Sequence, residues 1–223
     1  IVLHANQEHD QLRTAVISIL IFLLFIIFTV SRAIFSNTLS GEIASYNFIL
    51  SCLTALVLGL TIGWFAEQYL KKIWRSGSSV TIAPHEIIAE SKETGEVRLN
   101  LEAGITQFSW YFKLENTDRN GRERRLPRSS VCLASEVAQG DGYVVVYTYV
   151  PTKEAMNWTD KLREIDPREL TDEKSRRFAA SKTRTIPVEL LRGKNGSYWI
   201  AERHRWQTGM ELTKKDFETF MEK

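Results

Sequence analysis

Two apolar stretches near the start of the chain decide its fold. The first, from Ala15 to Phe35, reads AVISILIFLLFIIFTVSRAIF, and the second, from Phe48 to Leu70, reads FILSCLTALVLGLTIGWFAEQYL. A helix needs about 20 apolar residues to cross the hydrocarbon core of a bilayer, and both stretches have that length. Their charged residues, Arg32 and Glu67, lie close to their ends. The sequence therefore predicts a hairpin of two membrane-spanning helices.

Basic residues beside the two stretches predict which way the hairpin faces. Arg13 precedes the first span, and Lys71, Lys72 and Arg75 follow the second, whereas Arg32 is the only basic residue near the connecting loop. Lysine and arginine accumulate on the cytoplasmic side of membrane proteins. We therefore predict a multi-pass protein of the inner (cell) membrane with both termini in the cytoplasm and the lipid bilayer as a partner.

Small residues recur every four positions along the second span. They are Ser51, Ala55, Gly59 and Gly63. Small residues let two helices approach closely, so that van der Waals packing holds them together inside lipid. Two partners are open for this face: the first span of the same chain, or another copy of the chain in a homo-oligomer.

The composition of the chain is that of a folded protein, and the part after the two spans is long enough for one domain. The whole sequence has 223 residues, is 43% hydrophobic, and contains 29 basic against 27 acidic residues. This balance argues against a disordered tail protein and against general nucleic-acid binding. We therefore divide the chain into a membrane hairpin at residues 1–75 and a cytoplasmic domain at residues 76–223.

Alternating apolar and polar residues predict strands in the first half of this domain. Two alternating segments cover residues 97–103 and 108–114, and an apolar run, YVVVYTYV, covers residues 143–150. The pairs Asn120-Gly121 and Asp141-Gly142 suit tight hairpin turns. The sequence thus predicts an antiparallel meander of five or six strands.

The second half of the domain mixes helical and strand patterns. Trp158, Leu162 and Ile165 have the spacing of a helix face. The other predicted elements are a helix from about Pro167 to Ser181, a hairpin of residues 185–191 and 197–206 around Asn195-Gly196, and a final helix opened by Thr213-x-x-Asp216. The predicted fold class is a membrane α-helical hairpin plus an α+β domain, mostly an antiparallel β meander with a few helices.

The sequence contains no recognisable catalytic motif. Phosphate-binding, dinucleotide-binding, nucleophile-elbow and zinc-protease motifs are all absent. The four histidines are scattered, and none has a cysteine or histidine at metal-ligand spacing. Cys132 lies in a predicted strand, where a small buried thiol is the ordinary interpretation. We predict a protein that is not an enzyme and has no metal site or cofactor.

Two arginine-rich segments are the candidate ligand site. Residues 119–128 hold five arginines and one acid, and residues 203–206 combine two arginines with a tryptophan. Guanidinium groups suit phosphate, and tryptophan can stack on a base. A solvated hairpin and a strand with one core face are the alternatives for these two segments. The predicted ligand-binding residues are Arg122, Arg124, Arg125, Arg128, Arg203, Arg205 and Trp206.

The layout of two N-terminal spans and a β-rich cytoplasmic domain resembles the small membrane effectors of bacterial phage defence of the CRISPR and CBASS types. In those proteins a cyclic oligonucleotide binds the soluble part of an oligomer and perturbs the membrane part. The small-residue stripe and the arginine segments carry this resemblance. It implies a homo-oligomeric antiviral sensor and effector that binds a cyclic nucleotide or another anionic ligand.

The layout also resembles bacterial proteins that have a pleckstrin-like domain after two spans. Residues 79–91, followed by the predicted meander, carry this second resemblance. It implies a constitutive scaffold or accessory subunit of a membrane complex, whose domain binds lipid or protein. The function predicted from the sequence is the first one, a membrane-anchored, non-enzymatic oligomeric sensor and effector that binds an anionic ligand and perturbs its transmembrane helices, and the scaffold is the alternative.

Overall fold

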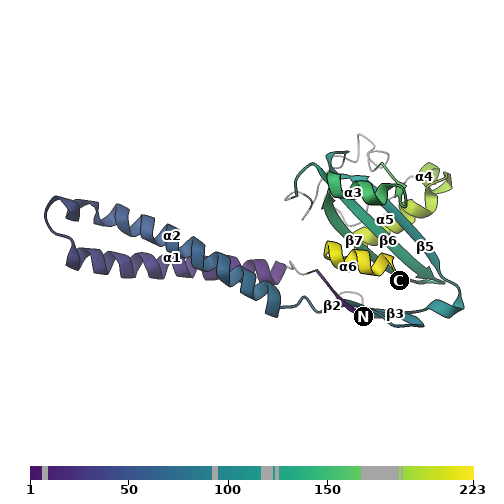
Figure 1. Ribbon diagram of the computed structural model, residues 1–223, viewed down its shortest axis with the longest axis horizontal. Coiled ribbons are helices and arrows are strands. Elements are labelled where there is room, and N and C mark those ends of the chain that lie inside the picture. Colours follow the sequence, from purple (N-terminus) through teal and green to yellow (C-terminus); the bar gives the residue numbers. More distant parts are fainter. Residues whose placement is uncertain (7–9, 92–94, 117–122, 124–125, 167–185, 187) are drawn as a thin grey trace. The chain divides into compact units, whose positions relative to one another are not determined.

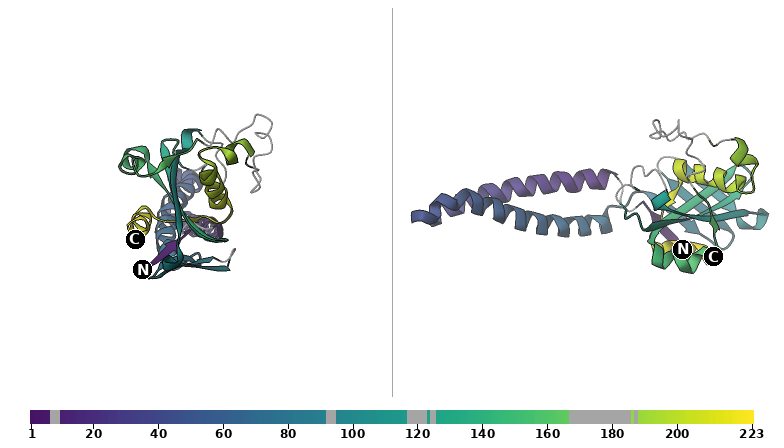
Figure 2. Two further views of the ribbon diagram at one scale, coloured as in Figure 1. Left: turned by 90° about the vertical axis from the view of Figure 1, so that its right-hand side faces the viewer. Right: turned by 90° about the horizontal axis from the view of Figure 1, so that it is seen from above.

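The chain folds into two compact units (Figures 1 and 2). The computed structural model describes residues 1–6, 10–91, 95–116, 123, 126–166, 186 and 188–223. One unit is Gln7–Ser76, and the other joins Ile1–Asn6 to Gly77–Lys223. The two units divide between Ser76 and Gly77, and the segment Ile1–Asn6, which contains a short strand, belongs to the second unit, whereas the sequence-based division keeps residues 1–75 together. A strand this short has no apolar pattern that would reveal it.

The first unit is a hairpin of two long helices, α1 (Asp10–Thr38) and α2 (Asn47–Ile73), joined through the 3₁₀ helix η1 (Gly41–Tyr46). Neither helix contains proline, and a helix satisfies its backbone hydrogen bonds internally, as hydrocarbon requires. Both helices are long and apolar enough to cross a membrane. The predicted spans at 15–35 and 48–70 lie within them.

The contact of α2 with α1 is made through small residues. The buried residues of α2 are Ser51, Ala55, Gly59 and Gly63. A Cβ atom on Gly59 would lie 2.6 Å from a side-chain carbon of Leu24, and one on Gly63 would lie 2.9 Å from a side-chain carbon of Leu20. The stripe therefore packs within the chain, which is one of the two arrangements that the sequence leaves open.

Sheet A contains four antiparallel strands in the order β1-β2-β3-β4. Their bounds are Val2–Ala5, Ser78–Ile82, Glu86–Ser91 and Gly95–Asn100. The helical hairpin is thus an insertion between two neighbouring strands. The strand predicted at 97–103 ends early, because η2 (Leu101–Ala103) follows it and the Asn100 side chain accepts a hydrogen bond from the Glu102 backbone N–H.

Sheet B contains five strands in the order β8-β5-β6-β7-β9. Their bounds, in chain order from β5, are Thr106–Lys113, Ser130–Gln139, Gly142–Pro151, Arg163–Glu164 and Met210–Glu211. The three long strands are antiparallel, whereas β8 and β9 join the edges in parallel, so the sheet is mixed. The β6–β7 hairpin turns at Gly140 and Asp141, one position before the predicted Asp141-Gly142 pair, because Gly142 already pairs in β7 and Gly140 has a φ of 57°, which glycine adopts without strain.

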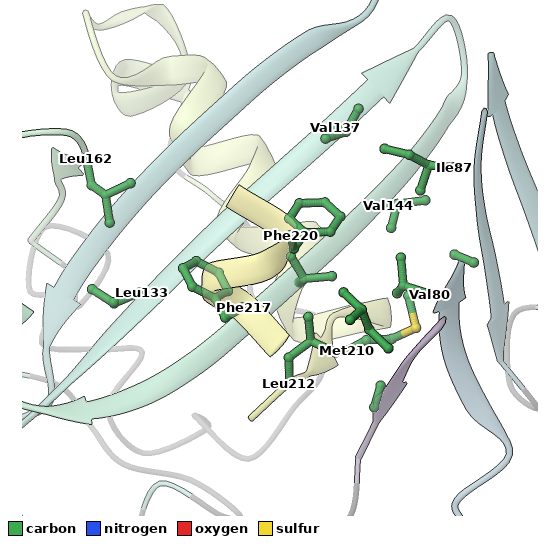
Figure 3. Close-up of a cluster of buried hydrophobic side chains, with 14 of the residues drawn as sticks. Val80, Ile87, Leu133, Val137, Val144, Leu162, Met210, Leu212, Phe217 and Phe220 are labelled. Carbon is green, nitrogen blue, oxygen red and sulfur yellow. The ribbon is translucent and has the colours of Figure 1, made fainter. Parts of the chain in front are cut away.

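One face of sheet B packs against sheet A and two helices. The helix α6 (Lys214–Met221) inserts Phe217 and Phe220 into this apolar core (Figure 3). The helix α3 (Thr152–Thr159) contributes Ala155 to the same core. At about 25 cal/mol per Å² of apolar surface, each phenylalanine stabilises the fold by roughly 2–3 kcal/mol. This core ties the two sheets together.

The opposite face of sheet B is covered by α4 (Val188–Arg192) and α5 (Gly196–Thr208). Trp110 of β5 and Trp199 of α5 meet in this second core, where they are 0% and 1% exposed. Figure 2 shows α5 and α6 on the two sides of the sheet. The strands are therefore buried on both faces, which explains the long apolar run at residues 143–150.

The hairpin predicted from residues 185–191 and 197–206 is wrong, because α4 and α5 occupy these positions. Gly196 does not form a strand turn. A Cβ atom there would lie 2.1 Å from the Leu191 carbonyl oxygen, so the glycine allows the start of α5 to approach the end of α4. The sequence pattern indicated a glycine-dependent bend, but it did not distinguish a helix junction from a hairpin.

The other helix predictions have mixed outcomes. Thr213 caps α6 as predicted, and its hydroxyl oxygen accepts a hydrogen bond from the Asp216 backbone N–H. The helix face expected to continue through Leu162 and Ile165 is wrong, because α3 ends at Thr159 and β8 follows. The predicted helix at 167–181 lies outside the described residues.

Candidate functional site

The structure describes four of the seven residues predicted to bind an anionic ligand, and these four differ in burial. Outside the described residues lie Arg122, Arg124 and Arg125. Arg128 is exposed on the segment that leads into β6. On α5, Arg205 is buried, whereas Arg203 and Trp206 are half-buried. The second arginine segment is therefore part of the packing between α5 and sheet B.

Glu202 and Arg205, which lie one helical turn apart on α5, form a buried ion pair. The Arg205 Nη2 atom lies 2.6 Å from Glu202 Oε1, and Arg205 Nε donates to both carboxylate oxygens at 3.0 and 2.9 Å. The Trp110 indole N–H donates to Glu202 Oε2 at 2.8 Å. Glu202 is 1% exposed and Arg205 is 6% exposed. Together these donors satisfy a carboxylate that has almost no access to water.

Aromatic rings and one further acid complete the surroundings of Arg205. Its guanidinium lies over the rings of Phe112 and Tyr147, at 5.0 and 5.1 Å from their centres. Glu123 Oε1 lies 3.3 Å from Arg205 Nη2 and accepts a hydrogen bond of 3.1 Å from the Tyr149 hydroxyl. Glu123 is the only acid in the segment 119–128. Glu123 is thus bound to the buried Arg205.

Electrostatics keep Arg205 charged in this position. Burial opposes its charge, but the Glu202 carboxylate outweighs burial and raises the pKa of Arg205 well above its ordinary value. Removing one partner of a buried ion pair costs about 3–5 kcal/mol, because the other charge is left unpaired. An external anion would have to displace Glu202 at that cost. The geometry therefore favours a structural role for Arg205 over the predicted role in ligand binding.

Burial also determines the protonation of two neighbouring groups. It raises the pKa of the Cys132 thiol and that of the Tyr149 hydroxyl above their ordinary values. Cys132 is 0% exposed, so the interpretation as a buried structural thiol is confirmed. A protonated thiol without solvent access is a poor nucleophile.

A second polar pair joins α5 to sheet B. His204 Nδ1 lies 2.8 Å from Glu136 Oε2, and the Tyr143 ring stacks on the imidazole at 3.8 Å. A carboxylate that holds an imidazole in this way can orient a general base. Within the described part of the chain, however, no hydroxyl or thiol is hydrogen-bonded to this ring, and the Thr208 hydroxyl donates to the His204 carbonyl instead. Among the described residues, this pair orients the His204 ring but is not joined to a side-chain nucleophile.

A small hollow opens where the β6–β7 hairpin meets sheet A. Its volume is about 160 Å³, with Asp141 and Tyr143 among the polar lining residues and Val97 and Met210 among the apolar ones. Pockets that hold drug-sized ligands have roughly 300–1,000 Å³. Among the residues that the structure describes, no three His, Cys, Asp or Glu side chains lie close enough to hold a metal ion. The hollow has room for only a few ligand atoms.

Sequence reasoning missed both polar pairs on α5. Trp110 and Glu202 are 92 positions apart, and Glu136 and His204 are 68 positions apart. A helix assignment for residues 197–206 would have placed Glu202 and Arg205 on one face, which is the signal that was available. No known protein family, curated protein or solved structure matched the chain.

Proposed function

We propose that the protein is a non-enzymatic, membrane-anchored scaffold or accessory subunit of a membrane complex. In this proposal α1 and α2 cross the inner membrane, and the β domain lies on the cytoplasmic side. The observation that carries the proposal is the position of the helical hairpin, which is inserted between two paired strands of one sheet. The domain is therefore attached to the membrane at two points.

The pairing of β1 with β2 supports this anchoring. The Ile82 backbone N–H donates to the Ile1 carbonyl at 2.8 Å, and Leu3 lies opposite Val80 in the register. Leu3 is 3% exposed and Val80 is 0% exposed, so both strands belong to the core. Because the strands on either side of the hairpin are paired, the start of α1 and the end of α2 must emerge on the same side of a membrane.

Two contacts favour a constitutive anchor over a gated one. The β1–β2 pairing holds the two chain ends of the hairpin next to each other. Gly59 and Gly63 place the helices in direct contact with Leu24 and Leu20. A scaffold requires no change in either contact, whereas an effector that moves α1 relative to α2 within one chain would have to break the helix contact.

The distribution of basic residues supports the cytoplasmic orientation. Arg13, Lys71, Lys72 and Arg75 lie at the open end of the hairpin, and Arg32 lies towards its closed end. A four-stranded sheet followed by the β5–β6–β7 meander is the part of the element order that a pleckstrin-like domain would share, whereas α3, β8, α4, α5 and β9 then precede the last helix, α6. Such a domain would bind lipid or protein from the cytoplasmic side.

One observation favours the second candidate, a homo-oligomeric sensor of an anionic ligand such as a cyclic oligonucleotide. Glu123, the only acid among the arginines of the segment 119–128, has its carboxylate bound to Arg205 and Tyr149. Because this carboxylate also binds Arg205, we propose that it compensates less of the charge of the arginines beside it in the sequence. Their charge could then attract phosphate groups.

Purification from native membranes in mild detergent distinguishes the two functions. The scaffold proposal predicts that the protein co-purifies with another membrane protein in a stoichiometric complex. It predicts that the double variant Arg122→Ala/Arg124→Ala forms the same complex. The sensor predicts a homo-oligomer that binds a member of a cyclic-oligonucleotide panel in calorimetry, with loss of binding in the double variant. A homo-oligomer that binds nucleotide would contradict the scaffold proposal.

A further inference from the structure

The register of the hairpin follows from two close contacts. Gly59 of α2 lies against Leu24 of α1, and Gly63 lies against Leu20. Moving four residues forward along α2 therefore moves four residues back along α1, as expected for antiparallel helices in contact. This antiparallel register determines which positions of α1 and α2 lie at the same depth.

Charged residues mark two levels along this hairpin. Continuing the register places Arg13 level with Leu70, next to Lys71, and places Arg32 level with Ser51. No Asp, Glu, Lys or Arg lies between Arg13 and Arg32 in α1. At 1.5 Å per residue, these two arginines are about 28 Å apart along the helix.

The charge-free length of α2 is similar. From the start of the helix at Asn47 to Glu67 there is no charged residue, which corresponds to about 30 Å. Glu67 lies slightly inside the level of Arg13, but its Oε1 atom is 2.8 Å from the Lys71 Nζ atom one turn further towards the open end. A long polar side chain that reaches towards the interface in this way keeps its charge out of hydrocarbon.

The surface between the two charged levels suits lipid. Phe22 and Phe25 are 70% and 67% exposed. Thr29, Thr54 and Thr61 donate their hydroxyl hydrogens to backbone carbonyls one turn earlier, so these hydroxyls need no water.

We infer that the hairpin fits a bilayer whose hydrocarbon core is about 28 Å thick, with Arg13 and Lys71 in one headgroup layer and Arg32 in the other. This inference rests on the proposed membrane anchoring. The helices have 29 and 27 residues and would extend over about 40 Å, so the charged residues determine the thickness and helix length does not. The end of α1 beyond Arg32 then lies outside the hydrocarbon.

The test measures which lipid the full-length protein prefers. The protein is reconstituted in phosphatidylcholines of increasing acyl length, and flotation first checks that it is inserted. Brominated lipid of one length then competes with unbrominated lipid of another, and quenching of the exposed Trp64 and Trp74 in the hairpin reports their relative affinities. We expect an optimum at the acyl length whose bilayer core is closest to about 28 Å.

Three exposed positions on α1 provide matched variants. Arg32→Leu removes the charge that marks the boundary at the closed end of the hairpin and should move the optimum to longer lipids. Thr29→Arg places a charge about 4–5 Å deeper and should move it to shorter lipids. Ser36→Arg, which adds the same charge beyond Arg32, should leave the optimum unchanged.

The experiment distinguishes a failure of the inferred thickness from a failure of the proposed membrane anchoring. If the protein floats with every vesicle but shows no acyl-length optimum, or if Arg32→Leu and Thr29→Arg leave that optimum in place, the inferred thickness is wrong while the anchoring stands. If the protein floats with none of the vesicles, the proposed membrane function itself is contradicted.

Discussion

The helical hairpin and the β domain place the same kinds of side chain in opposite surroundings. In the hairpin, Phe22 and Phe25 are 70% and 67% exposed, and the contact between the helices is made by glycine, alanine and serine. In the β domain, Trp110 and Phe112 are 0% and 1% exposed. A helix pair that turns its large apolar residues outward is stable when its solvent is hydrocarbon, where close backbone packing replaces the hydrophobic effect.

Charged side chains also differ between the two units, in the opposite sense to the large apolar ones. The charged residues of α1 and α2 are Asp10, Arg13, Arg32, Glu67, Lys71 and Lys72, all away from the middle of either helix. The β domain instead holds Glu202 and Arg205 in its core, with each charge satisfied by the other. The comparison indicates that the two units use different sources of stability, so substitutions in one should not mimic substitutions in the other.

The largest expected effect is on the buried ion pair of the β domain. Arg205→Met leaves the Glu202 carboxylate buried without its partner and should lower the free energy of unfolding by about 3–5 kcal/mol. Chemical denaturation followed by tryptophan fluorescence measures this change. The half-buried neighbour provides the control, because Arg203→Met should change stability by less than about 1 kcal/mol.

A double variant sharpens this prediction. Glu202→Gln combined with Arg205→Met removes both charges and should recover a substantial part of the lost stability. If Arg205→Met is as stable as the unsubstituted protein, the ion pair has no structural role, and Arg205 becomes available again as a ligand-binding residue.

The second effect concerns the contact between the helices. Gly59→Leu forces a side chain into the position of Leu24 and should destabilise the hairpin by about 1–3 kcal/mol. Leu24→Ala in the same chain should recover part of the loss, whereas Leu60→Phe on the exposed side should have little effect. Thermal loss of helical circular dichroism in detergent measures these differences.

The same variant tests the alternative use of the small-residue stripe. If the stripe were the interface of a homo-oligomer, Gly59→Leu would reduce the molar mass measured by light scattering and leave the stability of the monomeric hairpin unchanged. That result would contradict the packing of α2 on α1.

A smaller effect is expected at the start of α6. Thr213→Ala removes the oxygen that accepts the Asp216 backbone N–H and should destabilise the β domain by about 1 kcal/mol. Thr213→Ser keeps that oxygen and should preserve most of the stability. Equal stability of the alanine and serine variants in urea would show that the cap contributes nothing.

The smallest effect is a change at alkaline pH. Burial, followed by the hydrogen bond to Glu164, raises the pKa of Tyr111 from 10.0 to about 12. The unfolded chain therefore ionises this tyrosine first, so its contribution is present below pH 10 and is lost as the pH rises to about 12. Tyr111→Phe should make that loss shallower.

The magnitude of this pH effect is limited by solvent. The Glu164 side chain is 55% exposed, so its interaction with Tyr111 is weakened by water. We therefore expect the loss in free energy of unfolding between pH 10 and pH 12 to differ by less than about 1 kcal/mol between Tyr111→Phe and the unsubstituted protein. Urea denaturation at several pH values checks it. If Tyr111→Phe and the unsubstituted protein lose stability in parallel above pH 10, then Tyr111 does not titrate as described.

Local patterns in the sequence were sufficient for the elements that depend on neighbouring residues. The apolar stretches at 15–35 and 48–70 predicted α1 and α2 because helix length and composition are local properties. The Thr213 cap and the β6–β7 hairpin likewise depend on contacts within a few residues. In each of these cases, the interaction that forms the element is between residues close together in the sequence.

The features that were missed depend on contacts between distant residues. β1 is defined by its pairing with β2, whose partner residues come 73 to 79 positions later in the chain. The assignment of residues 197–206 failed because alternating apolar residues, such as Tyr198 and Ile200, resemble a strand until sheet B is present to select the helical face that carries Glu202 and Arg205. Tertiary packing, which a local pattern does not contain, decided both cases.

The most direct test of the central claim is the side of the membrane on which three positions lie. Val2→Cys, Ser40→Cys and Lys223→Cys are introduced singly into a chain in which Cys52 is replaced by alanine, since the remaining Cys132 is buried. Inverted membrane vesicles and intact cells are then labelled with a membrane-impermeant maleimide. The account predicts that positions 2 and 223 react in inverted vesicles and position 40 reacts in intact cells. Labelling of all three positions from one side, or of positions 2 and 223 from opposite sides, would contradict it.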